Sequence, residues 1–150
     1  MNTQKWINIA SKIFIGLSAA SLLSVSLMAF SNPQSVMDLV HVPLNNTDAL
    51  SSIRGVYGGV GLTLVISLIY LMLKDVQKGL AFLCLLWGFY AMSRLITIAA
   101  EGSLGAFGNQ WLFIESLFFG IAAALYVLRK KIQGFEKHNK VVYDKQVRTA

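Results

Sequence analysis

Four long apolar stretches restrict the fold of this chain more than any other feature. They cover residues 7–30, 55–73, 79–100 and 111–128. Each is close to the ~20 residues that an α-helix needs to cross the hydrocarbon core of a bilayer. They contain unbroken apolar runs, such as residues 81–86, rather than the alternation typical of a half-buried strand. Because a helix satisfies its own backbone hydrogen bonds in lipid, we expect four transmembrane helices.

The composition argues against a soluble enzyme. Hydrophobic residues make up 55% of the 150 residues and charged residues only 13%, whereas soluble domains carry roughly 25% charged residues. Intrinsic disorder is excluded as well, because it requires low hydrophobicity. The single cysteine, Cys84, can form neither an intrachain disulfide nor a cysteine-based zinc site. No hydrolase, nucleotide-binding or histidine–carboxylate metal motif is present in the sequence, so we expect no catalytic residue, metal or cofactor.

Polar segments mark the helix boundaries. Pro33 follows the first stretch, residues 45–48 supply N-caps for the second helix, and Lys74 and Asp75 end it. A polar turn is expected at 101–110, before the fourth helix. We predict an all-α membrane protein, an antiparallel four-helix transmembrane bundle. The predicted organisation is a domain at 1–131, with helices at about 7–30, 48–73, 79–100 and 111–128, and a basic cytoplasmic tail at 132–150.

The first stretch also resembles a signal peptide. Lys5 and Lys12 precede an apolar segment at 13–30, which is the order of charge and hydrophobicity in secretory signals. The small-residue cleavage pattern is poor at 27–30, and the segment is long enough to span a membrane. We favour an uncleaved helix and keep cleavage as the alternative.

Charged residues divide the chain into two unequal sides. One side holds eleven basic and three acidic residues, a formal charge of +8. It consists of the N-terminal segment, the loop between the second and third stretches, and the segment after the fourth stretch. The other side holds two basic residues, Arg54 and Arg94, and four acidic ones, a charge of −2. Because positive residues stay in the cytoplasm, we expect a multi-pass protein of the cell inner (plasma) membrane with both termini cytoplasmic.

The basic side also predicts partners. Arg129, Lys130 and Lys131 follow the fourth stretch directly, where they would contact anionic lipid head groups. No nucleic-acid recognition module accompanies the charge, so we expect no nucleic-acid partner. Small residues on the fourth helix leave a homo-oligomer or a subunit of a larger membrane complex as possibilities.

Arg94 is the most informative single residue because it lies inside the third helix, about six residues before its end. A buried guanidinium there is expected to face a partner rather than lipid. Glu115 is the natural partner, because a short turn makes the third and fourth helices neighbours and brings both residues to one depth. A charge-assisted pair is one alternative, and a protonated Glu115 bonded elsewhere is the other. The polar and aromatic stripe expected on this helix consists of Trp87, Tyr90, Arg94, Thr97 and Glu101.

The start of the second helix adds further candidates. Arg54 and Tyr57 lie beside three glycines, Gly55, Gly58 and Gly59. The spacing of these glycines predicts close helix packing, with backbone contact to a ligand as the alternative. The candidate polar cluster is therefore Arg54, Tyr57, Tyr90, Arg94, Glu101 and Glu115. In the preceding loop, residues 33–40 are expected to form a short interfacial helix opened by proline.

The order of these motifs resembles the bacterial domain-of-unknown-function 4345 family of small four-helix membrane proteins. The Arg-Gly-x-Tyr-Gly-Gly stretch at 54–59 is the most specific part, followed by Arg94, Glu101-Gly102 and Glu115. The resemblance covers roughly residues 5–130 and omits the basic tail. It implies the architecture and the choice of polar residues, and it implies no reaction.

Several function classes fit this pattern. The one we favour is a non-enzymatic binding or accessory and structural protein, whose Arg/Glu cluster holds a lipid-like or anionic ligand or locks the helices together. A small proton-coupled transporter is the main alternative, since buried ionisable residues mark such pathways. A membrane enzyme acting on a lipid or quinone is less favoured, because no nucleophile–base pair is visible.

Overall fold

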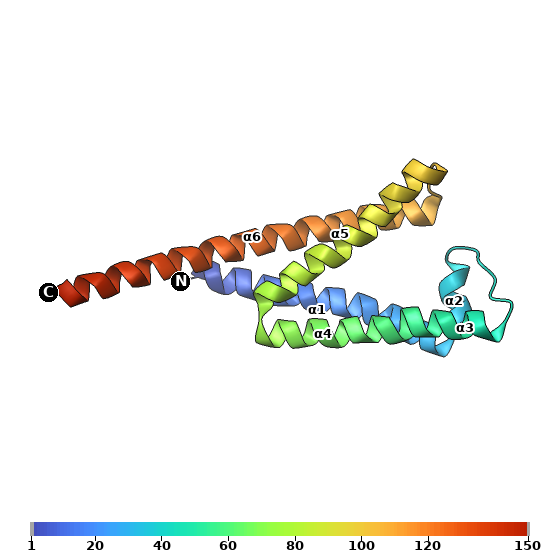
Figure 1. The fold of residues 1–150 in the computed structure, drawn as a ribbon, viewed down its shortest axis with the longest axis horizontal. Coiled ribbons are helices and arrows are strands. Elements are labelled where there is room, and N and C mark those ends of the chain that lie inside the picture. Colours follow the sequence, from blue (N-terminus) through green and yellow to red (C-terminus); the bar gives the residue numbers. More distant parts are fainter. Residues whose placement is uncertain (1, 150) are drawn as a thin grey trace.

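Helices make up nearly all of the chain in the computed structural model. The backbone is described for residues 2–149 and the side chains for residues 3–135, and no strand occurs within these ranges. The elements, in chain order, are α1 (Asn2–Ser31), α2 (Pro33–Asp38), α3 (Thr47–Ile53), the π-helix η1 (Arg54–Val60), α4 (Gly61–Lys74), α5 (Val76–Glu101) and α6 (Ala106–Thr149) (Figure 1).

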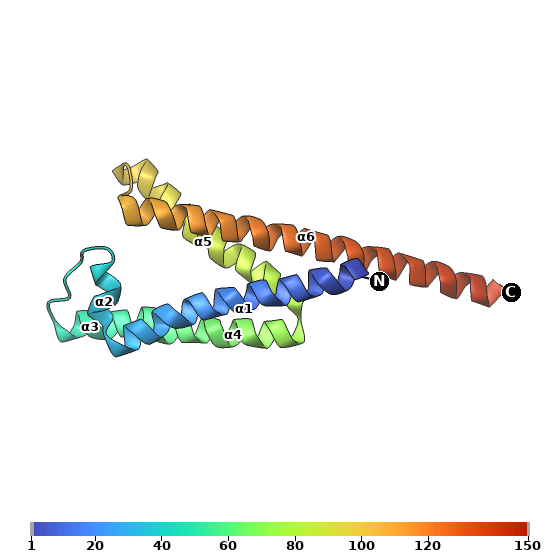
Figure 2. The same ribbon diagram turned by 180° about the vertical axis from the view of Figure 1, so that it is seen from behind.

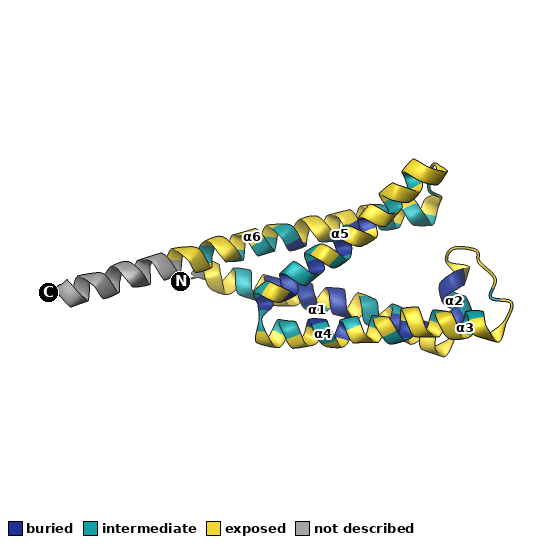
Figure 3. Cartoon of the chain, in the orientation of Figure 1, coloured by how far each residue is buried: buried dark blue, intermediate teal, exposed yellow. Residues whose placement is uncertain are grey.

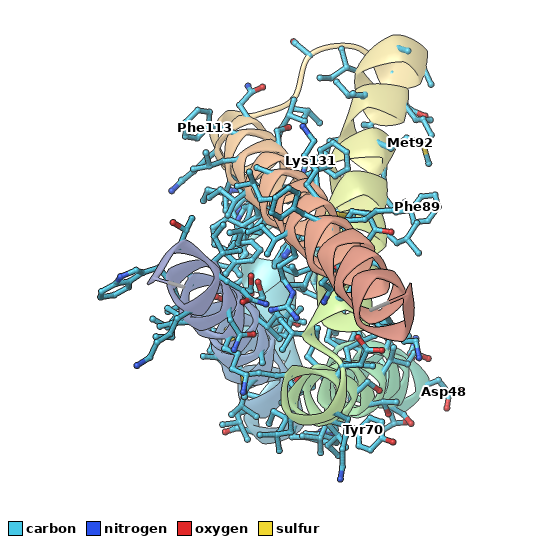
Figure 4. The ribbon with its side chains drawn as sticks, turned by 90° about the vertical axis from the view of Figure 1, so that its left-hand side faces the viewer. Asp48, Tyr70, Phe89, Met92, Phe113 and Lys131 are labelled. Carbon is cyan, nitrogen blue, oxygen red and sulfur yellow. The ribbon has the colours of Figure 1, made fainter. Side chains whose placement is uncertain are left out.

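Four segments are long and apolar enough to span a membrane. They are Thr3–Ser31, Thr47–Lys74, Val76–Glu101 and Ala106–Phe135, and the second comprises α3, η1 and α4. Among the described side chains, 31 large hydrophobic ones are exposed and only 14 hydrophobic residues are buried (Figure 3). Phe89, Met92 and Phe113 project away from the helices (Figure 4). Such a surface would be very costly in water, so the structure indicates a multi-pass membrane protein.

The helices pair two by two. α1 lies beside α4, and α5 lies beside α6 (Figures 1 and 2). The two pairs meet near the α4–α5 connection and diverge towards the end that carries α2. The shared core is made of fully buried apolar side chains, which are Ile15, Leu68, Leu80, Leu83 and Ala122. A smaller buried cluster, formed by Ala29, Val36 and Met37, lies at the α2 end of the molecule.

Side-chain caps end the helices where the sequence indicates. Asn46 accepts a hydrogen bond from the Ala49 N–H at 2.7 Å, which caps α3. Asp75 separates α4 from α5 and accepts from the Lys78 N–H at 3.1 Å. Gly102 ends α5 with φ +103°, a conformation that favours glycine. The predicted boundaries therefore hold to within a few residues at these points.

Two predicted boundaries differ from the structure. The predicted turn at 101–110 is shorter, because α6 already begins at Ala106. The fourth helix does not end near residue 128, because α6 continues to Thr149, and the division into a domain at 1–131 and a tail at 132–150 stays a prediction. The side chains of the tail from residue 136 onward lie outside the described residues, so the contacts expected of its charges are not part of the structure.

Gln34 holds the loop between α1 and α3 in place. Its amide nitrogen donates to Asp38 Oδ1 at 2.8 Å and to the Val42 carbonyl at 3.0 Å, and its oxygen accepts from the Leu44 N–H at 2.8 Å. The short helix opened by Pro33 is present as α2, and Asn32 caps it. The sequence pattern predicted this helix but not the role of Gln34.

Candidate functional site

Arg94 and Glu115 form a two-pronged ion pair between α5 and α6. Arg94 Nε donates to Glu115 Oε2 at 2.7 Å, and Arg94 Nη2 donates to Oε1 at 2.8 Å. The Glu115 side chain is only 3% exposed and that of Arg94 is 23% exposed. Of the two alternatives for Glu115, this fork-to-fork geometry is that of the charge-assisted pair. The turn at 102–105 brings both residues to one level, as the sequence indicates.

This ion pair lies in the wall of a cavity of about 260 Å³ between the two helix pairs. We call this space the interhairpin cavity. It lies at the diverging end of the molecule, which is the end that carries α2 (Figure 1). Apart from the ion pair, most of its wall is aliphatic or aromatic. The lining residues are Ser21, Leu22, Val25, Val36, Met37, Leu39, Val40, Tyr57, Trp87, Tyr90, Arg94, Phe107, Trp111 and Glu115.

The π-helix η1 contributes Tyr57 to the cavity. Its seven residues include three glycines, which tolerate the widened turn. An added Cβ on Gly58 would lie 3.0 Å from the Phe30 ring, so the backbone of η1 touches α1 at this point. π-Helical turns are frequent at functional sites. The cluster of glycines predicts close packing or backbone contact with a ligand, and it does not by itself predict the π-helix.

Trp87 connects α5 to α1 within the cavity wall. Its indole N–H donates to Ser18 Oγ at 3.3 Å, and both residues are buried. Its ring packs edge-on against Phe118, with ring centroids 5.0 Å apart. Ser18 was not among the predicted site residues, since serines in membrane helices usually bond to their own backbone, as Ser11 and Ser26 do here.

Two predicted members of the polar cluster lie elsewhere. Arg54 is exposed, and its Nε donates to the Phe30 carbonyl at 3.4 Å, in the last turn of α1. There it satisfies a carbonyl at a helix C-terminus. Glu101 is exposed in the last turn of α5 and does not line the cavity, and Thr97 is exposed one turn earlier. The stripe on α5 therefore contributes to the site only at Trp87, Tyr90 and Arg94.

The glycines pack differently from the prediction. Among the described residues, an added Cβ on Gly55 or Gly59 would meet nothing within 4 Å, so neither glycine lies at a close helix contact there. Gly58 contacts Phe30 as described above. A Cβ on Gly61 would collide with Ser26 Oγ, so α1 and this span also approach closely at Gly61. The close face includes residues 58 and 61, which are three residues apart and therefore neighbours on one side of the helix.

The three basic residues expected at the lipid head groups differ in their surroundings. Arg129 Nη1 donates a short hydrogen bond to Asn8 Oδ1 and links α6 to α1. Lys130 and Lys131 are exposed beside it. Among the side chains at 3–135, no group of three or more His, Cys, Asp or Glu residues lies close enough to hold a metal ion. The polar groups described above, such as the Arg94–Glu115 pair, can hold helices together and can bind a ligand through hydrogen bonds and charge.

Comparison with known proteins identifies a family for this chain. The model of a family described as a domain of unknown function (DUF4345) matches residues 10–126. No curated protein and no solved structure matches the chain at a significant level. The matched region contains the ion pair, the π-helix and every residue that lines the interhairpin cavity. Since it covers most of the chain, the protein belongs to the DUF4345 family.

Proposed function

We propose that this protein is a non-enzymatic binding or accessory protein of the cell inner membrane. In this proposal the four spans form an antiparallel bundle with both termini in the cytoplasm. The division of charge, +8 on the side of the termini and −2 on the other, supports this orientation. The interhairpin cavity would then lie in the outer leaflet and hold a lipid-like molecule.

The observation that carries the proposal is the ion pair in the wall of an otherwise largely apolar cavity. An acyl or isoprenoid chain would be accommodated by the aliphatic lining, including Leu22, Val25 and Met37. The lining residues come from both helix pairs, so such a chain would lie between the two pairs. Ligand pockets typically combine apolar walls with a few polar groups that fix orientation, which is the composition found here.

The geometry favours a neutral polar head over an anionic one. Arg94 is already neutralised by Glu115 through two hydrogen bonds, so an anionic ligand would have to displace a buried carboxylate. Tyr57 and Tyr90 line the same space, and a tyrosine hydroxyl can donate to or accept from a hydroxyl or carbonyl group. A lipid with an uncharged hydroxyl or carbonyl head is the class that fits best.

A structural role for the same pair is part of this proposal. The pair holds α5 against α6 at the end where the two helix pairs diverge, and buried pairs can specify an arrangement at little net stability. This role is compatible with a subunit of a larger membrane complex, in which a partner would cover the exposed apolar faces.

Proton-coupled transport is the second candidate. The observation that favours it is the buried carboxylate of Glu115 on the cavity wall. Against it, the ionisable groups cluster in one half of the bundle, whereas carriers place their sites near the midplane. Proton flux in proteoliposomes that is abolished by Glu115→Gln would place transport ahead of the binding role.

The proposed binding role can be tested by filling the cavity. Val25 lines it from α1, whereas Leu27 on the same helix is 57% exposed on the outer surface. Val25→Trp and the control Leu27→Trp add the same bulk to one helix. Native mass spectrometry of the full chain, purified in mild detergent, would measure the co-purified small molecules. We expect Val25→Trp to lose a bound lipid-like species that the wild type and Leu27→Trp retain.

Two other results would contradict the proposed binding role. One is an identical complement of bound molecules in all three proteins, and the other is an equal loss in both variants. A thermal unfolding curve for each variant verifies that the bundle is intact, so that a loss of ligand is separated from a loss of fold.

A further inference from the structure

A second cavity lies at the opposite end of the molecule, between the beginning of α1 and the later part of α6. Its volume is about 470 Å³, and we call it the α1–α6 cavity. The described residues that line it include two cations, three amide side chains and no carboxylate. They are Gln4, Lys5, Ile7, Asn8, Arg129, Ile132 and Gln133.

Arg129 is held in a defined position in this cavity. Its Nη1 donates to Asn8 Oδ1, so the guanidinium is anchored across the two helices. Its Nε is buried and has no hydrogen-bond partner, which is costly for a charged donor in a span. The other such atom in the described side chains is Gln77 Oε1, and Gln77 does not line the cavity. Of the residues that line the cavity, Arg129 is therefore the one with a buried, unsatisfied donor.

The cavity lies at the depth of lipid head groups. Lys5 and Arg129 are within two turns of the ends of their spans, Thr3–Ser31 and Ala106–Phe135. Trp6, beside Lys5, is 69% exposed, as is typical of an aromatic residue at the membrane interface. A ligand in this position would meet two positive charges at its polar end and apolar side chains, Ile7 and Ile132, at the other.

From these observations we propose that the α1–α6 cavity binds the phosphate group of an anionic phospholipid. A guanidinium matches phosphate oxygens with planar donors, and Arg129 brings this charge to the wall of the cavity. Lys5 supplies a second charge and Gln133 an amide donor. The proposal goes beyond the interhairpin cavity and depends on a different set of residues. It also assigns to Arg129 a role that its exposed neighbours Lys130 and Lys131 do not share.

The experiment compares three variants of the full chain in lipid nanodiscs. Arg129→Gln removes the anchored charge, and Lys130→Gln removes an equal charge from an exposed neighbour outside the cavity. Asn8→Ala keeps every charge and removes only the anchor of Arg129. Native mass spectrometry measures how much phosphatidylglycerol each protein retains relative to phosphatidylcholine. A separate arm titrates inorganic phosphate into detergent-solubilised protein by calorimetry.

We expect Arg129→Gln to reduce phosphatidylglycerol retention by about tenfold or more, the equivalent of one charge-assisted hydrogen bond. Lys130→Gln should change it by less than about twofold, as a screened surface charge does, and Asn8→Ala should lie between the two. Equal retention by all variants, or equal losses in Arg129→Gln and Lys130→Gln, would overturn the proposal. Arg129-dependent binding of inorganic phosphate without lipid retention would overturn the lipid as the source of the phosphate. Asn8→Ala, which leaves the cation in place, keeps the test decisive if Arg129→Gln does not fold.

Discussion

Arg94 on α5 and Glu115 on α6 are joined by two hydrogen bonds of 2.7 and 2.8 Å in the wall of the interhairpin cavity. The carboxylate is almost completely buried, and the guanidinium is only partly exposed. In a membrane span neither charge can be left alone without a large cost. The same pair therefore stabilises the bundle and forms part of the wall of the cavity that we propose as the ligand site.

A double-mutant cycle measures this connection. Arg94→Leu or Glu115→Leu alone should lower the free energy of unfolding by about 3–5 kcal/mol, because each leaves an unpaired buried charge. The double variant should recover much of that loss, since it leaves no charge behind. Unfolding of the purified protein in mixed detergent micelles, followed by circular dichroism, would give the three values. Additive single effects would show that the two side chains are not coupled.

Substitution of the glycines separates close packing from open surface. Gly61→Ala should destabilise the protein by about 1–3 kcal/mol, because its Cβ would collide with Ser26 Oγ. Gly55→Ala should cause no loss, because an added Cβ there meets nothing within 4 Å. Thermal unfolding of the two variants in one detergent compares them directly. A large loss in Gly55→Ala would indicate that this glycine packs against a second copy or another protein.

The junction between α4 and α5 should respond to pH through Asp75, which lies between two spans. The hydrogen bond from the Lys78 N–H lowers the pKa of this carboxyl below its usual value of 3.8. A lowered folded-state pKa means that the carboxylate stabilises the protein above about pH 4 and loses this effect as the pH falls through its folded pKa. Asp75→Ala should cost about 1 kcal/mol at neutral pH, the typical value of an N-cap.

Asp75→Asn is the matched control for that prediction. It keeps an acceptor for the Lys78 N–H and removes the charge, so its cap should be insensitive to pH. Melting temperatures of the wild type and both variants at pH 7 and pH 3 test the pair of expectations. A loss for Asp75→Ala that is the same at both pH values would contradict a stabilising role of the charge.

The proposed orientation predicts which residues can be labelled from outside the cell. The chain has a single cysteine, Cys84, so a Cys84→Ser background is free of thiols. In intact cells, Asn45→Cys and Ser103→Cys should react with a membrane-impermeant maleimide. Lys78→Cys and Gly134→Cys should react only after permeabilisation. The reverse pattern would show that the charge rule gives the wrong orientation for this protein.

The sequence predicted the spans and the ion pair for identifiable reasons. Helix length and hydropathy determine the spans, and the caps at Asn46 and Asp75 are local features of the chain. The pairing of Arg94 with Glu115 follows from a short turn, which fixes the relative depth of two neighbouring helices. Each of these inferences needed only distances along the chain.

The features that the sequence did not predict depend on contacts between distant segments. Arg54 bonds to the end of α1 because the loop after α2 returns the chain to that point. Gly61 meets Ser26 through the packing of this span against α1, and the glycines at 55–59 gave no indication of that contact. The anchored state of Arg129 depends on Asn8, which is 121 residues away in the chain.

An experimental structure of the protein in lipid nanodiscs tests the central proposal most directly. Our account predicts elongated non-protein density in the interhairpin cavity, with its polar end near Tyr57 and Tyr90 and the Arg94–Glu115 pair intact in the wall. Helix pairs closed against each other with protein side chains filling that space, or Arg94 and Glu115 facing apart, would contradict it.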